Sequence, residues 1–337
     1  MDTEYEPPSY STCDGVSPRC PVEFTVYGDY FTTGACAFFV AIYAVLLIAQ
    51  SYLGYRSKAW SYISYLAIGT AFELMGYAAR IALSYNPWNY PGFVVQLLML
   101  ILAPTLVAAA ISITCKHLVV WYGPRWSFLR PSLYPWVFVG TDFMSILIQA
   151  VGGAVSAVAS DSEDMAILDV GSGLLVAGVA FQLANMVFCG GLMVLYLLRR
   201  RRGLKNGNGA ERLGSSAADD SEGSGAESWA PYRKASPEMN RKVEMFIYAV
   251  SVAYLAIIVR CIYRIPEMSN GWGSELMQNE TTFLVLDGAM VLVAALVLTV
   301  VHPLFFFPYL GNKDIVGKQD TISTPAEQHE MNVVQQS

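Results

Sequence analysis

The chain has 337 residues, of which 54% are hydrophobic and only 14% are charged, and its mean hydropathy is +0.41. A soluble domain carries roughly a quarter charged residues, so this composition argues against a soluble protein and indicates an integral membrane protein. The formal net charge is −6, and the single basic run, the arginines at 199–202, directly follows an apolar segment. That placement is typical of a membrane border and not of a nucleic-acid-binding surface, so no nucleic-acid partner is expected.

The first thirty residues are acidic and contain several prolines. They lack a basic stretch followed by an apolar core, so we expect no cleavable signal peptide. Cys13 and Cys20 are the only cysteines outside apolar runs. An oxidising compartment could join them in a disulfide, whereas a reducing one would leave two free thiols, and the sequence leaves both open.

Seven apolar runs follow, each near the length of about 20 residues that spans the hydrocarbon core of a bilayer. They lie at about 31–52, 61–84, 93–116, 134–158, 167–197, 243–264 and 283–303. These runs are hydrophobic on all sides and too long for barrel strands. The expected fold is therefore an all-α membrane protein, a bundle of seven transmembrane helices.

Basic residues in the connections orient the bundle. The first connection carries Arg56 and Lys58, the third carries three basic residues, and the fifth begins with the arginines at 199–202. The second connection is uncharged and the fourth is acidic. Lysine and arginine accumulate on the cytoplasmic side, so we expect the N-terminus outside and the C-terminus in the cytoplasm.

Composition also divides the chain into segments. We expect an extracellular N-terminal tail at 1–30, a transmembrane domain at 31–303 and a cytoplasmic tail at 304–337. The connection at 199–242 is rich in glycine, serine and acidic residues. Such a composition buries too little apolar surface to order itself, so a disordered cytoplasmic loop is expected there.

Polar side chains recur inside the apolar runs at helical spacing, so that members three, four or seven positions apart share one helix face. Those we expect to line a polar network between helices, binding an amphiphilic ligand, are Glu73, Tyr77, Arg80, Gln96, Asp142, Gln149, Gln182, Arg260, Arg264, Glu267, Glu280 and Asp287. Charged residues at membrane depth normally face inward and pair. Two simpler interpretations stay open: side chains that extend to water at the membrane border, and amides that only join helices. Pro104, inside the third run, should free a backbone carbonyl that neighbours must satisfy.

Depth along the helices predicts specific partners. At about 1.5 Å per residue, Arg80, Arg260 and Asp287 share one level near the outer boundary. Glu280 lies about one turn above them, and Glu73 lies deeper, close to the midplane. We expect Arg260 to pair with Asp287, and Arg80 to join them or Glu280. Together they would form the floor of a pocket open to the outer leaflet, with carboxylates for a cationic head group.

Six sequence motifs between about Ser61 and Pro303 match those of a known family, in the same order: ELMGYAAR, QLLMLILAPTLVAA, DFMSILIQAVGG, GSGLLVAGVAFQ, RCIYRIPE and ETTFLVLD. They resemble the fungal RTA-like family, the lipid-translocating exporters with seven membrane helices. Ser112 and Phe283 stand where that family usually has tyrosine. The resemblance implies a fungal protein of the plasma membrane, linked to lipid transport or drug resistance. Its ligands would be amphiphiles such as sphingoid bases, sterol-like toxins or porphyrins.

The residues argue against an enzyme. Intramembrane zinc hydrolases need about three histidines with a carboxylate, and here His329 lies in the tail while His117 and His302 lie at cytoplasmic helix ends. No Walker motif is present, and we expect no metal and no cofactor. Two hypotheses remain: a translocator of lipids or amphiphiles, and a seven-helix receptor or sensor of lipids or stress. The large receptor family's DRY-like and NPxxY-like strings are missing, which disfavours the receptor.

Overall fold

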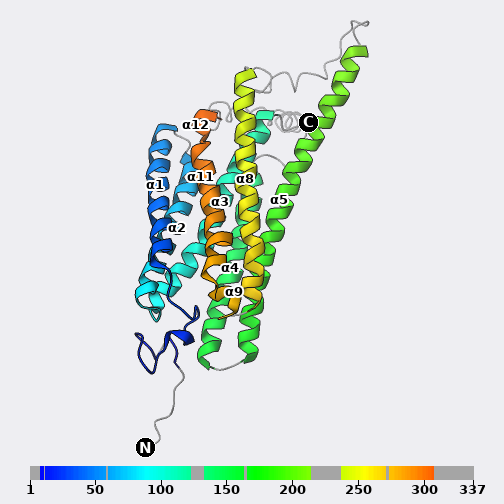
Figure 1. Cartoon of the computed structure of the whole chain (residues 1–337). Coiled ribbons are helices and arrows are strands. Elements are labelled where there is room, and N and C mark those ends of the chain that lie inside the picture. Colours follow the sequence, from blue (N-terminus) through cyan, green and yellow to red (C-terminus); the bar gives the residue numbers. More distant parts are fainter. Residues whose placement is uncertain are drawn as a thin grey trace, which may run out of the picture.

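The computed structural model of the protein describes residues 8–10, 12–57, 60–122, 133–162, 165–213, 237–270 and 273–306. Within these ranges, seven helices are long and apolar enough to cross a membrane. They run alongside one another in a single elongated bundle (Figure 1). The expected class, an all-α protein with seven transmembrane helices, is confirmed, and the chain is a multi-pass membrane protein.

Six of the spans are continuous helices: α1 (Thr33–Ser57), α2 (Trp60–Tyr85), α3 (Tyr90–Tyr122), α4 (Leu133–Ser162), α5 (Met165–Leu213) and α8 (Pro237–Ser269). The seventh span, Glu280–Val300, is composite. It comprises α10 (Glu280–Phe283), the π-helical turn η3 (Leu284–Gly288) and α11 (Ala289–Val300). Short helices flank it, α9 (Glu275–Gln278) before and α12 (Pro303–Phe306) after.

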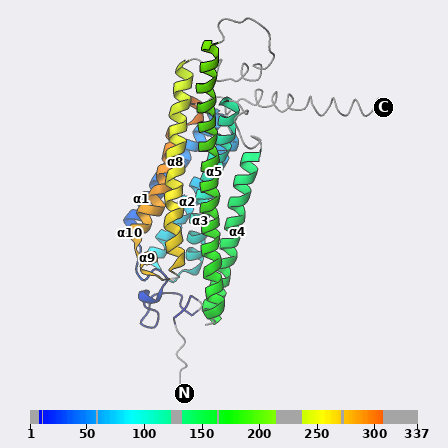
Figure 2. The ribbon, with the colours of Figure 1, turned by 90° about the vertical axis from the view of Figure 1, so that its right-hand side faces the viewer.

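Successive spans run in opposite directions, so the bundle has two distinct ends. We call the end that carries the N-terminal segment the disulfide end, and the opposite end, which carries Arg56 and Arg199, the arginine end. The tightest neighbours are α1 with α2, α2 with α3, α4 with α5, and α8 with α11. Both views show α5 beside α4 and α8, with α5 extending beyond the bundle at the arginine end (Figures 1 and 2). The largest buried cluster draws on α2, α3, α5, α8 and α11, so the core runs along the bundle axis.

Glycines bring α4 and α5 into close contact. A Cβ on Gly152 would lie 2.7 Å from the backbone nitrogen of Leu175, and a Cβ on Gly178 would lie 3.0 Å from the carbonyl of Ser145. Side chains larger than glycine would therefore force the two backbones apart. This approach sets Gln149 of α4 directly against α5, where Gly178 faces its side chain.

The expected helix limits differ most around the fifth connection. Helix α5 continues through the arginines at 199–202 to Leu213, and α8 begins at Pro237 and passes through Pro266 to Ser269. Arginine, leucine and lysine are good helix formers, so a helix need not stop where the apolar run stops. The loop expected at 199–242 is thus helical at both ends, and its middle, 214–236, lies outside the described residues.

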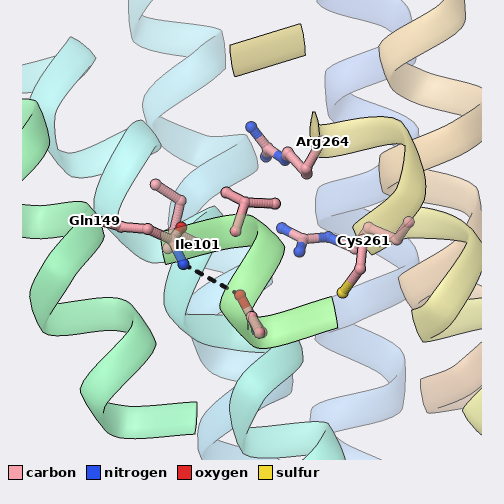
Figure 3. A pocket seen from close by; sticks show the side chains of 7 residues that line it. Ile101, Gln149, Cys261 and Arg264 are labelled. Atoms are coloured by element: carbon pink, nitrogen blue, oxygen red, sulfur yellow. Dashed lines mark hydrogen bonds between the residues drawn. The ribbon is translucent and has the colours of Figure 1, made fainter. Parts of the chain in front are cut away.

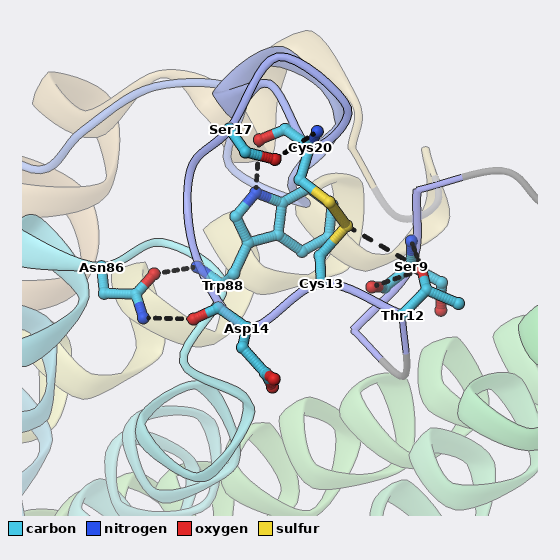
Figure 4. The surroundings of a disulfide bond; sticks show 8 residues. All are labelled: Ser9, Thr12, Cys13, Asp14, Ser17, Cys20, Asn86 and Trp88. Carbon is cyan, nitrogen blue, oxygen red and sulfur yellow. Dashed lines mark hydrogen bonds between the residues drawn. A yellow bond between two sulfur atoms is a disulfide. The ribbon is translucent and has the colours of Figure 1, made fainter.

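The N-terminal segment, described from residue 8 except for residue 11, folds onto the connection between α2 and α3. A disulfide joins Cys13 to Cys20, with their Cα atoms 6.0 Å apart. Trp88 Nε1 donates a hydrogen bond to the Cys20 carbonyl (3.1 Å), and Asn86 Nδ2 donates one to the Asp14 carbonyl (2.8 Å; Figure 4). The segment is therefore a fixed part of the disulfide end.

Candidate functional site

Several buried charged side chains converge on the π-helical turn of the seventh span. Asp287 is fully buried, and its Oδ1 lies 2.8 Å from Nε of Arg260 and 2.9 Å from Nε of Arg264. The structure therefore contains the expected Arg260–Asp287 pair. A single carboxylate oxygen serves two guanidinium groups, both of which α8 presents from successive turns.

Glu267 completes this arrangement, because its Oε2 lies 3.0 Å from Nη1 of Arg264. We call Arg260, Arg264, Glu267 and Asp287 the charge cluster; all four are at most 6% exposed. Two guanidinium groups face two carboxylates, so the formal charges balance. Balance and pairing are what allow charged groups to stay inside a membrane protein.

Pro104 accounts for a further contact of Arg260. Proline has no N–H, so the carbonyl four residues earlier in α3, that of Leu100, has no helical partner. Arg260 Nη2 donates to this carbonyl at 2.5 Å. The carbonyl that the sequence predicted to be free is thus satisfied by the charge cluster, which ties α3 to α8.

Aromatic residues of α1 and α2 support the π-helical turn. Tyr43 donates a hydrogen bond to the Gly288 carbonyl at 3.3 Å, and a Cβ at Gly288 would collide with the Tyr77 hydroxyl. Phe39 stacks on Tyr77 with ring centroids 4.6 Å apart. A π turn carries one extra residue in the helix and often marks a functional site. Here that turn contains Asp287.

A small cavity lies against the two arginines, between α3, α4, α5 and α8 (Figure 3). Its lining residues are Ile101, Gln149, Val179, Gln182, Arg260, Cys261 and Arg264. Its volume of about 10 Å³ has room for about one water molecule. Gln149 Nε2 donates to Gln182 Oε1 across it, at 3.2 Å.

The polar lining of this cavity consists of guanidinium and amide groups. Arginine N–H groups can only donate, so the lining suits an acceptor such as a hydroxyl, carbonyl or phosphate oxygen. The carboxylates of Glu267 and Asp287 are not part of the lining. The expectation that carboxylates would receive a cationic head directly in the pocket is therefore not met by this cavity.

The expectation for Arg80 is wrong: it forms no ion pair with Asp287 or Glu280 in the described part of the chain. Its guanidinium carbon lies 3.9 Å from the ring centroid of Phe31 and 4.2 Å from that of Phe283. A cation over an aromatic face is stabilised without a carboxylate. Phe31 directly precedes α1, and spacing within one helix could not reveal its contact with α2.

Three further residues that were expected in the polar network lie apart from the charge cluster. Glu280 is partly exposed and accepts hydrogen bonds from the backbone N–H (3.0 Å) and the hydroxyl (2.7 Å) of Thr32, at the start of α1. Gln96 donates to the Tyr27 hydroxyl at 2.8 Å, and burial raises the pKa of that hydroxyl. Both contacts lie at the disulfide end, one with the start of α1 and one with the N-terminal segment, so neither residue joins the charge cluster.

Asp142, the third of these, accepts a hydrogen bond from Asn185 Nδ2 at 2.7 Å. Asn185 was missed, although it lies three residues after Gln182 and so on the same face of α5, a spacing that could have revealed it. Glu73 and Tyr77 are buried on α2 beside the charge cluster, but neither lines the cavity. The cavity thus draws together Gln149, Gln182, Arg260 and Arg264 from the expected set.

Comparison with known proteins is consistent with this arrangement. The family model described as RTA1 like protein matches residues 66–309. The sphingoid long-chain base transporter RSB1 of Saccharomyces cerevisiae is 28% identical over 276 residues, covering 80% of this chain and 70% of the relative. Protein RTA1 of the same species is 24% identical over 269 residues, covering 80% and 74%. No solved structure matches the chain.

The match to the family model includes six of the seven spans entirely or in large part and contains every residue of the charge cluster and of the cavity lining. Both relatives also align over most of their own length. The chain belongs to the RTA1-like protein family.

Proposed function

We propose that this protein moves lipid-like amphiphiles across the membrane, with sphingoid bases as the substrate class, and that it does so without enzymatic chemistry. The observation that carries the proposal is the cavity at membrane depth, with Arg260 and Arg264 in its wall and each arginine paired with a carboxylate that is not part of the lining. The relative named as a sphingoid long-chain base transporter supports the substrate class. We place the protein in the plasma membrane with its disulfide end outside, as loop charge suggests.

The chemistry of the lining fits one part of such a substrate. A sphingoid base carries hydroxyl groups beside its amine, and hydroxyl oxygens accept hydrogen bonds from guanidinium and amide N–H groups. The cavity admits only about one water-sized group. We therefore propose that the head group enters as α4 and α5 separate from α3 and α8, while the hydrocarbon chain remains in lipid.

The N-terminal segment would then cover the route at the outer end. Val26 and Tyr27 pack against a cluster that includes Val179, and Val179 also lines the cavity. Phe31 covers the guanidinium of Arg80. We propose that the substrate enters or leaves sideways between helices, because this segment closes the direct path along the bundle axis.

Purified protein in liposomes with a fluorescent dihydrosphingosine tests the proposal. Wild-type protein should accelerate transfer between leaflets relative to protein-free liposomes. Ile101→Trp, which fills the cavity, should return transfer to that background, whereas Ile48→Trp, at a position 71% exposed on α1, should not. Equal transfer by the two variants would refute the cavity as the route. Binding without transfer by the wild type would instead indicate the sensor hypothesis.

A further inference from the structure

Glu73 is a buried acid that the charge cluster does not use. Its side chain on α2 is 1% exposed, and no described residue hydrogen-bonds to either of its carboxyl oxygens. The ionisable groups that face it are Tyr43 from α1, Tyr77 from α2, Asp287 from η3, and Arg260 and Arg264 from α8. The other two elements that meet here contribute none: α3 has no ionisable residue between Tyr90 and Cys115, and α11 has none at all.

The two cations that face Glu73 are already engaged. The Nε atoms of Arg260 and Arg264 both face Oδ1 of Asp287. The Tyr43 hydroxyl lies near Glu73 but donates its hydrogen bond to the Gly288 carbonyl. In this arrangement Asp287 holds both cations, so Glu73 has no counter-ion, and the donors that face it are the neutral hydroxyls of Tyr43 and Tyr77.

An ionised carboxylate in such surroundings is far more costly than a protonated one. Burying an unpaired charge costs several kcal/mol of free energy. Burying a neutral carboxyl costs only about the free energy of the hydrogen bonds to water that it loses. Asp287 adds a like charge nearby, which penalises a second carboxylate further. The protonated acid is therefore the form that this conformation favours.

We infer that Glu73 carries an exchangeable proton, which it releases when the ammonium group of a cationic amphiphile enters beside the charge cluster. This inference rests on the proposed function for the identity of the cation. The O–H bond of the Glu73 carboxyl breaks, its electron pair stays on the carboxylate, and water accepts the proton. The charge cluster is balanced before the cation arrives. Loss of the proton supplies the one negative charge that the added ammonium requires, so transport exchanges a proton for a cation.

Infrared difference spectroscopy of the purified protein tests the proton itself. The wild type should show the carbonyl stretch of a protonated carboxyl at neutral pH, shifted in heavy water and removed by Glu73→Gln. Asp169→Asn, at an exposed position on α5, is the matched control and should keep the band. Glu73→Asp should move the band without abolishing it, which guards against loss of folding in the glutamine variant. A spectrum of the wild type identical to that of Glu73→Gln would overturn the inference.

Proton release on binding tests the coupling. Dihydrosphingosine added to weakly buffered wild-type protein should release roughly one proton per ligand bound, and Glu73→Gln should bind without release. In liposomes, a proton gradient should change the rate of wild-type transfer several-fold and leave the variant unaffected. If a proton gradient does not change the rate of wild-type transfer, the proposed coupling to Glu73 is refuted, whereas the proposed transport function is not. An absence of any binding or transfer would instead refute the proposed function.

Discussion

Removing the shared carboxylate of the charge cluster should be the most damaging single change at this site. Asp287→Ala leaves Arg260 with the Leu100 carbonyl and Arg264 with Glu267, so one fully buried oxygen that serves two cations is lost. Breaking a buried ion pair from one side costs about 3 to 5 kcal/mol. Asp287→Asn keeps a hydrogen-bond acceptor, and a hydrogen bond from a charged donor contributes about 1.5 to 3 kcal/mol to stability. Asp287→Asn should therefore destabilise the protein less than Asp287→Ala by about that amount.

Equilibrium unfolding of purified protein in mixed detergent measures these free energies. Val285→Ala, in the same turn but 52% exposed, controls for a general effect on η3. Because Glu73 is a second carboxyl that faces both arginines, the comparison is repeated in the Glu73→Gln background, where the full cost should appear. Equal free energies of unfolding for Asp287→Ala and Asp287→Asn in that background would refute the electrostatic account.

Three further predictions concern the ends of the bundle. A tag before residue 8 should be cleaved by protease added to intact cells, and a tag within 214–236 should be spared; the reverse pattern would invert the topology. Burial lowers the pKa of His302 to about 4 from its ordinary 6.5, so the unfolded chain binds the proton first and stability should fall as pH decreases through that interval. His302→Phe should flatten this slope in unfolding curves, and an unchanged slope would contradict the assignment. Asn279, in the sequon Asn279-Glu280-Thr281, accepts a hydrogen bond from Thr282 N (3.1 Å) to cap α10 at the membrane border. We expect it to stay unglycosylated; a glycosidase-sensitive mass shift abolished by Asn279→Gln would show otherwise.

The sequence predicted the seven spans and part of the site, because both depend on the spacing of residues within single helices. Apolar length alone identified seven helices, and helical spacing with depth led to the pair of Arg260 and Asp287. The absent N–H of Pro104 predicted a free carbonyl, and the structure shows which side chain satisfies it. Each of these inferences needs only the geometry of one helix and the cost of an unpaired charge in lipid.

What the sequence could not show depends on contacts between distant segments. The π turn at Leu284–Gly288 has no signature of its own in the chain, and it is supported by aromatic residues of α1 and α2. Arg80 was assigned a carboxylate from its depth along the helix, whereas the rings of Phe31, just before α1, and Phe283 cover its guanidinium. Glu280 likewise faces Thr32, 248 residues away in the chain.

The most direct test of the central claim is to locate the bound substrate. A photoactivatable sphingosine, crosslinked to purified protein in liposomes and mapped by mass spectrometry, should label peptides of α3 and α5 that contain Ile101 and Val179. Unlabelled dihydrosphingosine should suppress that labelling, and Ile101→Trp should remove it. Labelling confined to lipid-facing positions such as Ile48, unaffected by competition, would contradict a binding site at the charge cluster.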